Sequence, residues 1–286
     1  MKQNLGNSLT SFGLKQAFSY LESDPQKNMP QLIKWAEKFD RKGNYSKEIM
    51  GVKNSLSDPD NNWNILVNNF WNLDAGVRKK TFENFFVNGV FRARNKLDES
   101  RAKYHCNVPW AILMDPTSAC NLRCTGCWAA DYGNKMNMSY ETLDDIIRQG
   151  KELGTYFYIY SGGEPLVRKK DILRLCEKHN DCMFLAFTNG TFIDEAFANE
   201  MLRVKNFIPA ITLEGFEKET DSRRGEGTYK AVEKAMDILH DKKLLFGNSC
   251  TYTRINTEVI GSERYFDFMI DKGHSLPGSL PTYRLE

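Results

Sequence analysis

The sequence has no apolar run that approaches the about 20 residues needed to cross a bilayer as a helix. Its first residues, 1–7, also lack the apolar core of a secretory signal peptide. We therefore expect a cytoplasmic protein without a transmembrane segment. Histidine is scarce as well, and the four histidines show no metal-binding spacing: His105, His179, His240 and His274.

A strong excess of one charge is missing too, because the net charge of the 286 residues is only +2. This balance gives no indication of a nucleic acid partner. Residues 1–105 nevertheless carry 17 Lys and Arg against 11 Asp and Glu, whereas the remainder carries 22 against 26. A basic first part and a mildly acidic second part favour two units.

Residues 1–105 are predicted to be helical. Apolar and aromatic residues recur there at helical spacing, most clearly within residues 14–21, 32–39, 63–71 and 75–103. Asp24-Pro25 marks a helix boundary, because Asp caps helices and Pro fits their first turn. We expect the stripes to pack on each other and on the next domain; the alternative is a membrane-surface or partner-docking face.

From about residue 108, short apolar runs alternate with amphipathic stretches, which predicts an α/β fold with a parallel sheet. The expected strands are 110–114, 156–160, 183–187, 207–213 and 246–251. The expected helices are 140–153, 170–179, 194–204, 229–242 and 261–272. We therefore divide the chain into a helical extension (1–105), an α/β core (106–273) and an irregular tail (274–286). In such sheets, ligands bind at the carboxyl ends of the strands.

Three of the seven cysteines follow the first expected strand, namely Cys120, Cys124 and Cys127. In a reducing compartment, closely spaced cysteines indicate thiols or metal ligands rather than disulfides. Structural zinc sites usually have four ligands, and no fourth cysteine lies nearby. Three thiolates suit three irons of a cubane cluster and leave the fourth iron open. A zinc site with a remote fourth ligand and three unrelated thiols remain as alternatives.

The other four cysteines are scattered, and we expect them to be buried hydrophobic residues rather than ligands of a second cluster. They are Cys106, Cys176, Cys182 and Cys250.

The spacing of the three clustered cysteines, opened by Cys120-Asn121-Leu122, resembles the radical S-adenosylmethionine (SAM) superfamily. This resemblance implies a partial parallel (β/α) barrel that holds a [4Fe–4S] cluster and SAM. It also implies reductive cleavage of SAM, radical chemistry on an unknown substrate, and a one-electron donor such as flavodoxin or ferredoxin. The helical first part is similar to the extension of an uncharacterised bacterial group within this superfamily.

The second expected strand ends in Ser161-Gly162-Gly163-Glu164. Two glycines let a backbone approach a ligand closely, and carbonyl and carboxylate oxygens suit an ammonium group. In isolation this sequence is a common turn. The resemblance implies that it binds the methionyl amino group of SAM.

The third and fourth expected strands end in further polar residues, Thr188 and Asn189 on one and Thr212 and Glu214 on the other. The resemblance implies that Thr188 or Asn189 contacts SAM. Many relatives carry Ser-Leu-Asp-Gly where this chain has Thr212 to Gly215, so a hydroxyl and a carboxylate remain for the ribose or the methionyl carboxylate.

Two more residues complete the expected SAM site. An arginine at the start of the next helix can pair with the SAM carboxylate through two hydrogen bonds, and we favour Arg224 over Arg223 because relatives place it before a glycine. Trp128 follows the last cysteine and is expected to shield the cluster or flank adenine, with packing alone as the alternative.

The family barrel usually has six strand–helix units, and five are recognisable here. The tail supplies the sixth strand poorly, or the chain is truncated. Three hypotheses follow: an active radical SAM enzyme, a non-catalytic iron–sulfur-binding fragment, and a zinc-stabilised interaction protein.

Overall fold

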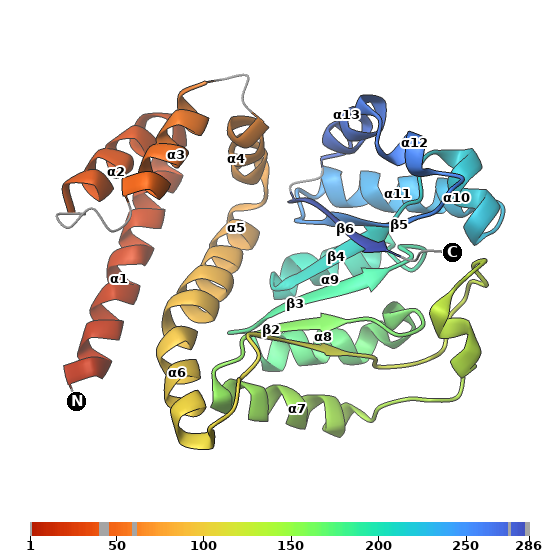
Figure 1. Ribbon diagram of the computed structural model, residues 1–286, viewed down its shortest axis with the longest axis horizontal. Coiled ribbons are helices and arrows are strands. Elements are labelled where there is room, and N and C mark those ends of the chain that lie inside the picture. The colour runs from red at the N-terminus through yellow and green to blue at the C-terminus, as the bar shows by residue number, and fades with distance from the viewer. Residues whose placement is uncertain (1, 40–45, 59–61, 274–275, 284–286) are drawn as a thin grey trace. The chain divides into compact units, whose positions relative to one another are not determined.

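The computed structural model describes residues 2–39, 46–58, 62–273 and 276–283, and the chain forms two compact units, Met1–Leu73 and Asp74–Glu286 (Figure 1). None of the described helices is both long and apolar enough to cross a membrane.

The first unit is helical in all its described parts, as predicted. Its helices are α1 (Lys2–Ser23), α2 (Pro25–Phe39), α3 (Ser46–Ser57) and α4 (Asn62–Asn72). The predicted boundary at Asp24 is confirmed, because its side chain accepts a hydrogen bond from the Lys27 amide at 3.1 Å. Aromatic stripes pack within this unit: Tyr20 stacks on Trp35 with ring centroids 5.4 Å apart.

The second unit begins with a long helical segment made of α5 (Ala75–Thr81), the π-helix η1 (Phe82–Arg92) and α6 (Ala93–Tyr104). Buried Asn84 donates to the carbonyl oxygens of Asn180 and Cys182, both at 2.8 Å. Buried Asn88 donates to that of Asp181 at 3.0 Å. These bonds attach the segment to the loop before β3, so the compact units divide after Leu73, earlier than the expected boundary at residue 105.

An apolar cluster anchors the end of the same segment. Ala93 and Leu97 of α6 pack with Val108 at the start of the α/β region, and Leu153 and Tyr156 lie against them. This small core therefore joins α6 to the start of the α/β region.

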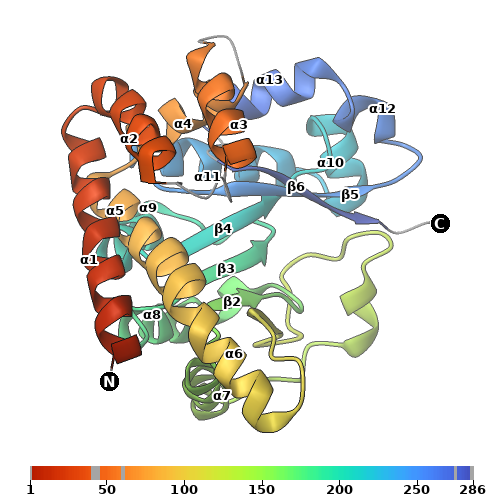
Figure 2. The same ribbon diagram turned by 60° about the vertical axis from the view of Figure 1, so that its left-hand side comes forward.

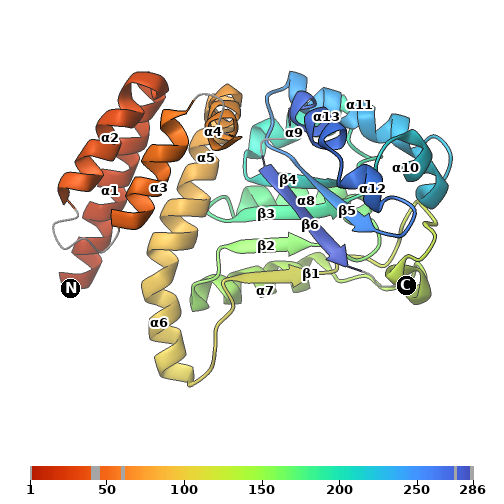
Figure 3. The same cartoon turned by 45° about the horizontal axis from the view of Figure 1, so that its top comes forward.

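A six-stranded parallel sheet forms the centre of the second unit, with the strands in sequence order (Figure 3). The strands are β1 (Ala111–Met114), β2 (Phe157–Tyr160), β3 (Met183–Thr188), β4 (Phe207–Thr212), β5 (Gly247–Tyr252) and β6 (Leu276–Tyr283). Sequential parallel pairing with helical connections makes an open, partial (β/α) barrel, which confirms the predicted fold class.

Seven helices connect the strands in the described residues; five of them were predicted to within a few residues, and those over 217–224 and 257–260 were not. They are α7 (Tyr140–Leu153), α8 (Lys169–Lys178), α9 (Glu195–Val204), α10 (Glu217–Arg224), α11 (Thr228–Asp241), α12 (Thr257–Ile260) and α13 (Glu263–Asp271), with short 3₁₀ turns η2 (Trp128–Tyr132) and η3 (Pro165–Arg168). The core between helices and sheet includes Leu143 and Ile147 of α7, Leu175 of α8 and Phe184 of β3, all completely buried.

The prediction of an irregular tail was wrong for residues 276–283, which form β6. Prolines and a glycine there remove the alternating pattern that identifies a strand. An edge strand tolerates proline because it needs hydrogen bonds on one side only. Its register with β5 shifts between Gly247 and Ser249. The remaining tail residues, 274–275 and 284–286, lie outside the described part of the chain.

Candidate functional site

The cysteine-containing loop follows β1 and lies beyond the carboxyl ends of the neighbouring strands (Figure 2). The turn after β2 binds this loop through its backbone. The amide of Gly163 donates to the carbonyl of Thr117 at 2.9 Å, and that of Glu164 donates to the carbonyl of Ala119 at 2.8 Å. These bonds fix the chain immediately before Cys120.

Both glycines of this turn are required by the close approach of the two backbones. Gly162 has a φ of +100°, and a side chain there would lie 2.6 Å from the carbonyl oxygen of Thr117. A Cβ at Gly163 would overlap the carbonyl oxygens of Ser118 and Ala119. The Gly-Gly sequence therefore holds the cysteine loop, a contact that its expected role as a ligand-binding turn did not include. Ser161 precedes it, and its amide donates to the carbonyl of Met114 at 2.9 Å.

The three clustered cysteines are partly buried and influence one another electrostatically. Burial is the main cause that raises the pKa of the Cys120 thiol, and negative charge on Cys124 and Cys127 raises it further. Within the described residues, no three His, Cys, Asp or Glu side chains are placed to share one metal ion. A cubane cluster requires a different spacing, because each thiolate binds its own iron.

Nitrogen donors surround two of the three sulfurs. The amide of Leu122 donates to Cys120 Sγ at 3.4 Å, and Asn189 Nδ2 lies 3.9 Å from the same atom. Arg224 Nη1 lies 3.8 Å from Cys124 Sγ. Such donors stabilise thiolates, so the donor set of this loop fits an iron–sulfur cluster held by ionised cysteines.

Glu164 links the ends of β2 and β3. Its side chain is almost completely buried; Oε1 accepts from the Leu166 amide at 2.9 Å and from Thr188 Oγ1 at 2.7 Å, and Oε2 accepts from the Asn189 amide at 2.7 Å. Burial is the main cause that raises the pKa of this carboxyl, and the hydrogen bonds oppose it. Its predicted contact with the SAM amino group stays a prediction, since both oxygens already have partners within the chain.

Asn189 and Asn121 cross-link the strand end to the cysteine loop. Asn189 Nδ2 donates to Asn121 Oδ1 at 2.9 Å, and its Oδ1 accepts from Thr191 Oγ1 at 2.7 Å. Asn121 in turn donates to Thr191 Oγ1 at 2.8 Å. Sequence reasoning treated Asn121 only as part of the Cys120 motif and gave it no role of its own.

Thr212 connects β4 to the preceding strand. Its hydroxyl donates to the carbonyl oxygen of Thr188 at 3.0 Å. The predicted site residues at three successive strand ends are therefore joined by direct hydrogen bonds.

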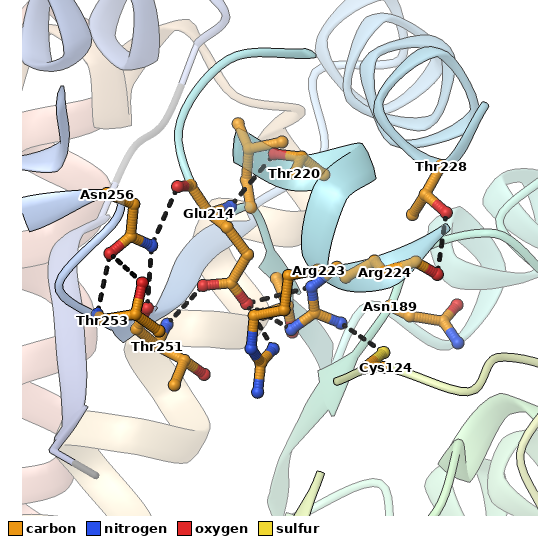
Figure 4. A network of polar contacts seen from close by, with 12 residues as sticks. Cys124, Asn189, Glu214, Thr220, Arg223, Arg224, Thr228, Thr251, Thr253 and Asn256 are labelled. Carbon is orange, nitrogen blue, oxygen red and sulfur yellow. Dashed lines mark hydrogen bonds and ion pairs between the residues drawn. The ribbon is translucent and has the colours of Figure 1, made fainter. Parts of the chain in front are cut away.

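Glu214 lies at the centre of a buried ionic network (Figure 4). Its Oε1 accepts from Arg223 Nη1 at 2.9 Å and from Arg224 Nη2 and Nε at 2.6 and 3.0 Å. Its Oε2 accepts from the amide of Thr251, on β5, at 2.8 Å. The two Arg224 nitrogens that bond to Glu214 could otherwise have bound the carboxylate of SAM, as the sequence predicted. The Glu214 side chain therefore forms its contacts within the protein.

Asn256, which sequence reasoning missed, supports this network from the loop after β5. Its Nδ2 donates to the carbonyl oxygens of Glu214 and Thr251, both at 3.0 Å, and its Oδ1 accepts from the Thr253 amide at 2.8 Å (Figure 4). The only sequence signal was its position shortly after a predicted strand.

Trp128 begins η2, directly after Cys127. Half of its surface is exposed, and it packs edge-to-face on Tyr132 at 5.9 Å. Its predicted role beside the cluster or adenine is not tested by this geometry.

The scattered cysteines divide into two groups. Cys176, Cys182 and Cys250 are buried as predicted, whereas the prediction for Cys106 was wrong, because it is exposed just beyond the end of α6.

Of the four histidines, His274 lies outside the described residues.

Comparisons with known proteins found similar sequences and structures. A 34% identical relative, an uncharacterised protein of Archaeoglobus fulgidus, matches over 177 residues, or 59% of this chain and 40% of the relative. The AdoMet-dependent heme synthase of Methanosarcina barkeri is 24% identical over 54% of this chain and 46% of its own length. The crystal structure of Streptococcus suis SuiB bound to S-adenosylmethionine superposes with a TM-score of 0.54 at 21% identity, covering 64% of this chain and 43% of SuiB.

This chain thus spans less than half the length of these relatives. The radical SAM superfamily matches residues 114–256, which is half of the chain and runs from the end of β1 to Asn256. Every residue of the network around Glu164 and Glu214 falls within this region. The chain therefore belongs to the radical SAM superfamily, whose members bind a [4Fe–4S] cluster and SAM.

Proposed function

We propose that this protein is a radical SAM enzyme in which Cys120, Cys124 and Cys127 hold a [4Fe–4S] cluster. When bound, the cluster supplies the electron that cleaves SAM reductively and starts radical chemistry on a substrate. The observation that carries the proposal is the placement of three partly buried thiols on one loop, with nitrogen donors directed at two of them. The electron comes from a one-electron donor such as flavodoxin or ferredoxin.

The residues at the strand ends form the SAM site in this proposal. Ser161, Gly162 and Gly163 with Glu164 orient the amino group, and Trp128 flanks the cluster or adenine. The remaining contacts fall to the ends of β3 and β4 and to the end of α10, namely Thr188, Asn189, Thr212, Glu214 and Arg224. Because most of these side chains are already fixed by hydrogen bonds to one another, the site is organised before the ligand arrives.

A second candidate function is a non-catalytic iron–sulfur protein. The contacts of the expected SAM-binding groups favour it, because both carboxylate oxygens of Glu164 and two nitrogens of Arg224 already bond within the chain. Named relatives such as the anaerobic sulfatase-maturating enzyme of Clostridium novyi are enzymes, and this chain covers 44% of that protein.

Anaerobic reconstitution with iron and sulfide tests the proposal. We expect wild-type protein to bind a cluster and, with dithionite and SAM, to release 5′-deoxyadenosine, measured by mass spectrometry. Cys124→Ala should lose most of the bound iron. Cys106→Ser is the matched control, because it removes an exposed thiol outside the cluster loop and should keep the wild-type iron content.

Each hypothesis gives a different result in this experiment. A Cys124→Ala variant with full iron content contradicts the assigned ligands. A cluster without release of 5′-deoxyadenosine selects the non-catalytic protein. One zinc, with neither iron nor sulfide, selects the zinc-stabilised protein.

A further inference from the structure

Arg224 occupies a position that the expected contact with SAM does not explain. It ends α10, and its side chain is 9% exposed. Two of its nitrogens, Nη2 and Nε, converge on Glu214 Oε1 at 2.6 and 3.0 Å. The third, Nη1, lies 3.8 Å from Cys124 Sγ. One side chain therefore connects a buried carboxylate to a cysteine of the cluster loop (Figure 4).

The carboxylate of Glu214 is fixed from several directions. The side chain is completely buried, and its second oxygen accepts from the amide of Thr251 on β5. The Glu214 backbone is held as well, because its amide donates to Thr220 Oγ1 and its carbonyl oxygen accepts from Asn256 Nδ2. A carboxylate held in this way presents one defined direction to Arg224.

The cysteine loop is attached to the same helix end by its backbone. The amide of Thr125, between the second and third cysteines, donates to the carbonyl oxygen of Arg223 at 2.8 Å. Cys124 therefore keeps its place beside Arg224 through a bond that does not involve the guanidinium. Removal of the Arg224 side chain leaves this attachment intact.

Two arginines lie near Cys124 and differ in their contacts with its sulfur. Arg224 and Arg223 both place positive charge near Cys124, and Arg224 Nη1 lies 3.8 Å from its Sγ. Both arginines bond to Glu214, Arg223 through one nitrogen and Arg224 through two, and within the described residues only Arg224 also donates to the sulfur. They form a natural pair of test and control positions.

We propose, on the basis of the function proposed above, that Arg224 is a positioning residue that donates an N–H···S hydrogen bond to the Cys124 thiolate and raises the reduction potential of the cluster. Hydrogen bonds to cluster sulfurs and nearby positive charge both favour the reduced, more negative state. Glu214 fixes the guanidinium in the orientation that this bond requires.

Potentiometry of the reconstituted protein, monitored by electron paramagnetic resonance without SAM, tests this proposal. Arg224→Gln, Arg223→Gln and wild-type protein are compared at equal iron content. Both variants lose one positive charge and one ion pair to Glu214, and only Arg224→Gln loses the donor to Cys124. We expect the midpoint potential of Arg224→Gln to lie below those of wild type and Arg223→Gln.

A midpoint potential in Arg224→Gln equal to that of wild type, or lowered no more than in Arg223→Gln, overturns the proposal. Should Arg224→Gln fail to assemble a cluster, Arg224→Lys is measured under the same criterion, because lysine keeps the charge and cannot bond to Glu214 and Cys124 in the same geometry. Failure of wild-type protein to bind iron contradicts the proposed function itself, so the two failures are distinguishable.

Discussion

Glu164 and Glu214 perform the same structural task at two places on the rim of the sheet. Each is buried at the end of a strand, and each uses both carboxylate oxygens to bind donors from a later part of the chain. A buried carboxylate is costly unless its hydrogen-bonding capacity is used. These two residues therefore fix the relative positions of the loops that carry the site.

Glu164→Gln is expected to destabilise the protein by about 1–3 kcal/mol, because the amide nitrogen would face either the donors at Oε1 or the amide of Asn189 at Oε2. The free energy of unfolding from urea titration measures the effect. Glu226→Gln is the matched control, since Glu226 is exposed and should change stability little. Equal stability of both variants would show that the three hydrogen bonds contribute nothing.

At the level of single residues, the sequence predicted the positions of the candidate site residues in the fold better than it predicted their contacts. Thr188, Asn189 and Glu214 are all at strand ends, as the alternation of strands and helices predicted. Their partners were not predictable, because the sequence does not distinguish a carboxylate that binds a ligand from one that pairs with an arginine. Only the folded chain shows that Glu214 reaches Arg224.

A contact between α7 and the end of α8 contains a buried histidine and a carboxylate. Asp144 of α7 accepts from Lys178 Nζ and pairs with His179 Nε2, each at 2.8 Å. Burial is the main cause that lowers the pKa of His179 below its usual value of 6.5, and Asp144 opposes this effect. The folded state therefore favours the neutral imidazole.

Because the pKa of His179 is lower in the folded state, the unfolded state binds more protons as the pH falls through 6.5, and stability decreases there. We expect the free energy of unfolding of wild type to fall between pH 7.5 and pH 5.5, and we expect His179→Gln to show a weaker fall. Urea unfolding at both pH values measures this. His240→Gln, at an exposed position, should keep the wild-type dependence; if His179→Gln keeps it too, the assignment is wrong.

Whole elements were predictable where burial produces a regular pattern. The helix over 140–153 was predicted with its observed ends, because its apolar residues face one side and Gly154 terminates it in a left-handed conformation. β6 was not predicted, since Pro277 and Pro281 interrupt the pattern and pairing with β5 depends on the rest of the sheet. The local sequence does not predict a strand that forms because it pairs with a neighbouring strand.

For the whole molecule, the division into units was the least accessible from sequence. Helical periodicity and a basic charge excess continue from the first residues to about residue 105, so neither marks a boundary at Leu73. The structure places the segment from α5 to α6 in the second unit through buried asparagines and a small apolar core.

This difference between the two boundaries is testable with two fragments. A fragment of residues 74–286 contains the complete second unit, whereas a fragment of residues 106–286 lacks the segment from α5 to α6. Its loss leaves the carbonyls of Asn180 and Cys182 without the donor Asn84, and it exposes Val108 by removing Ala93 and Leu97. Lost hydrogen bonds and lost apolar contacts both destabilise.

We therefore expect residues 74–286 to unfold in one cooperative thermal transition, followed by circular dichroism, and residues 106–286 to unfold at a clearly lower temperature or to lack a cooperative transition. Variant Asn84→Ala in the longer fragment isolates the hydrogen bonds from the apolar contacts and should lie between the two. Equal melting temperatures of both fragments would mean that residues 75–104 add nothing to the second unit, and the boundary near residue 105 would then be the correct one.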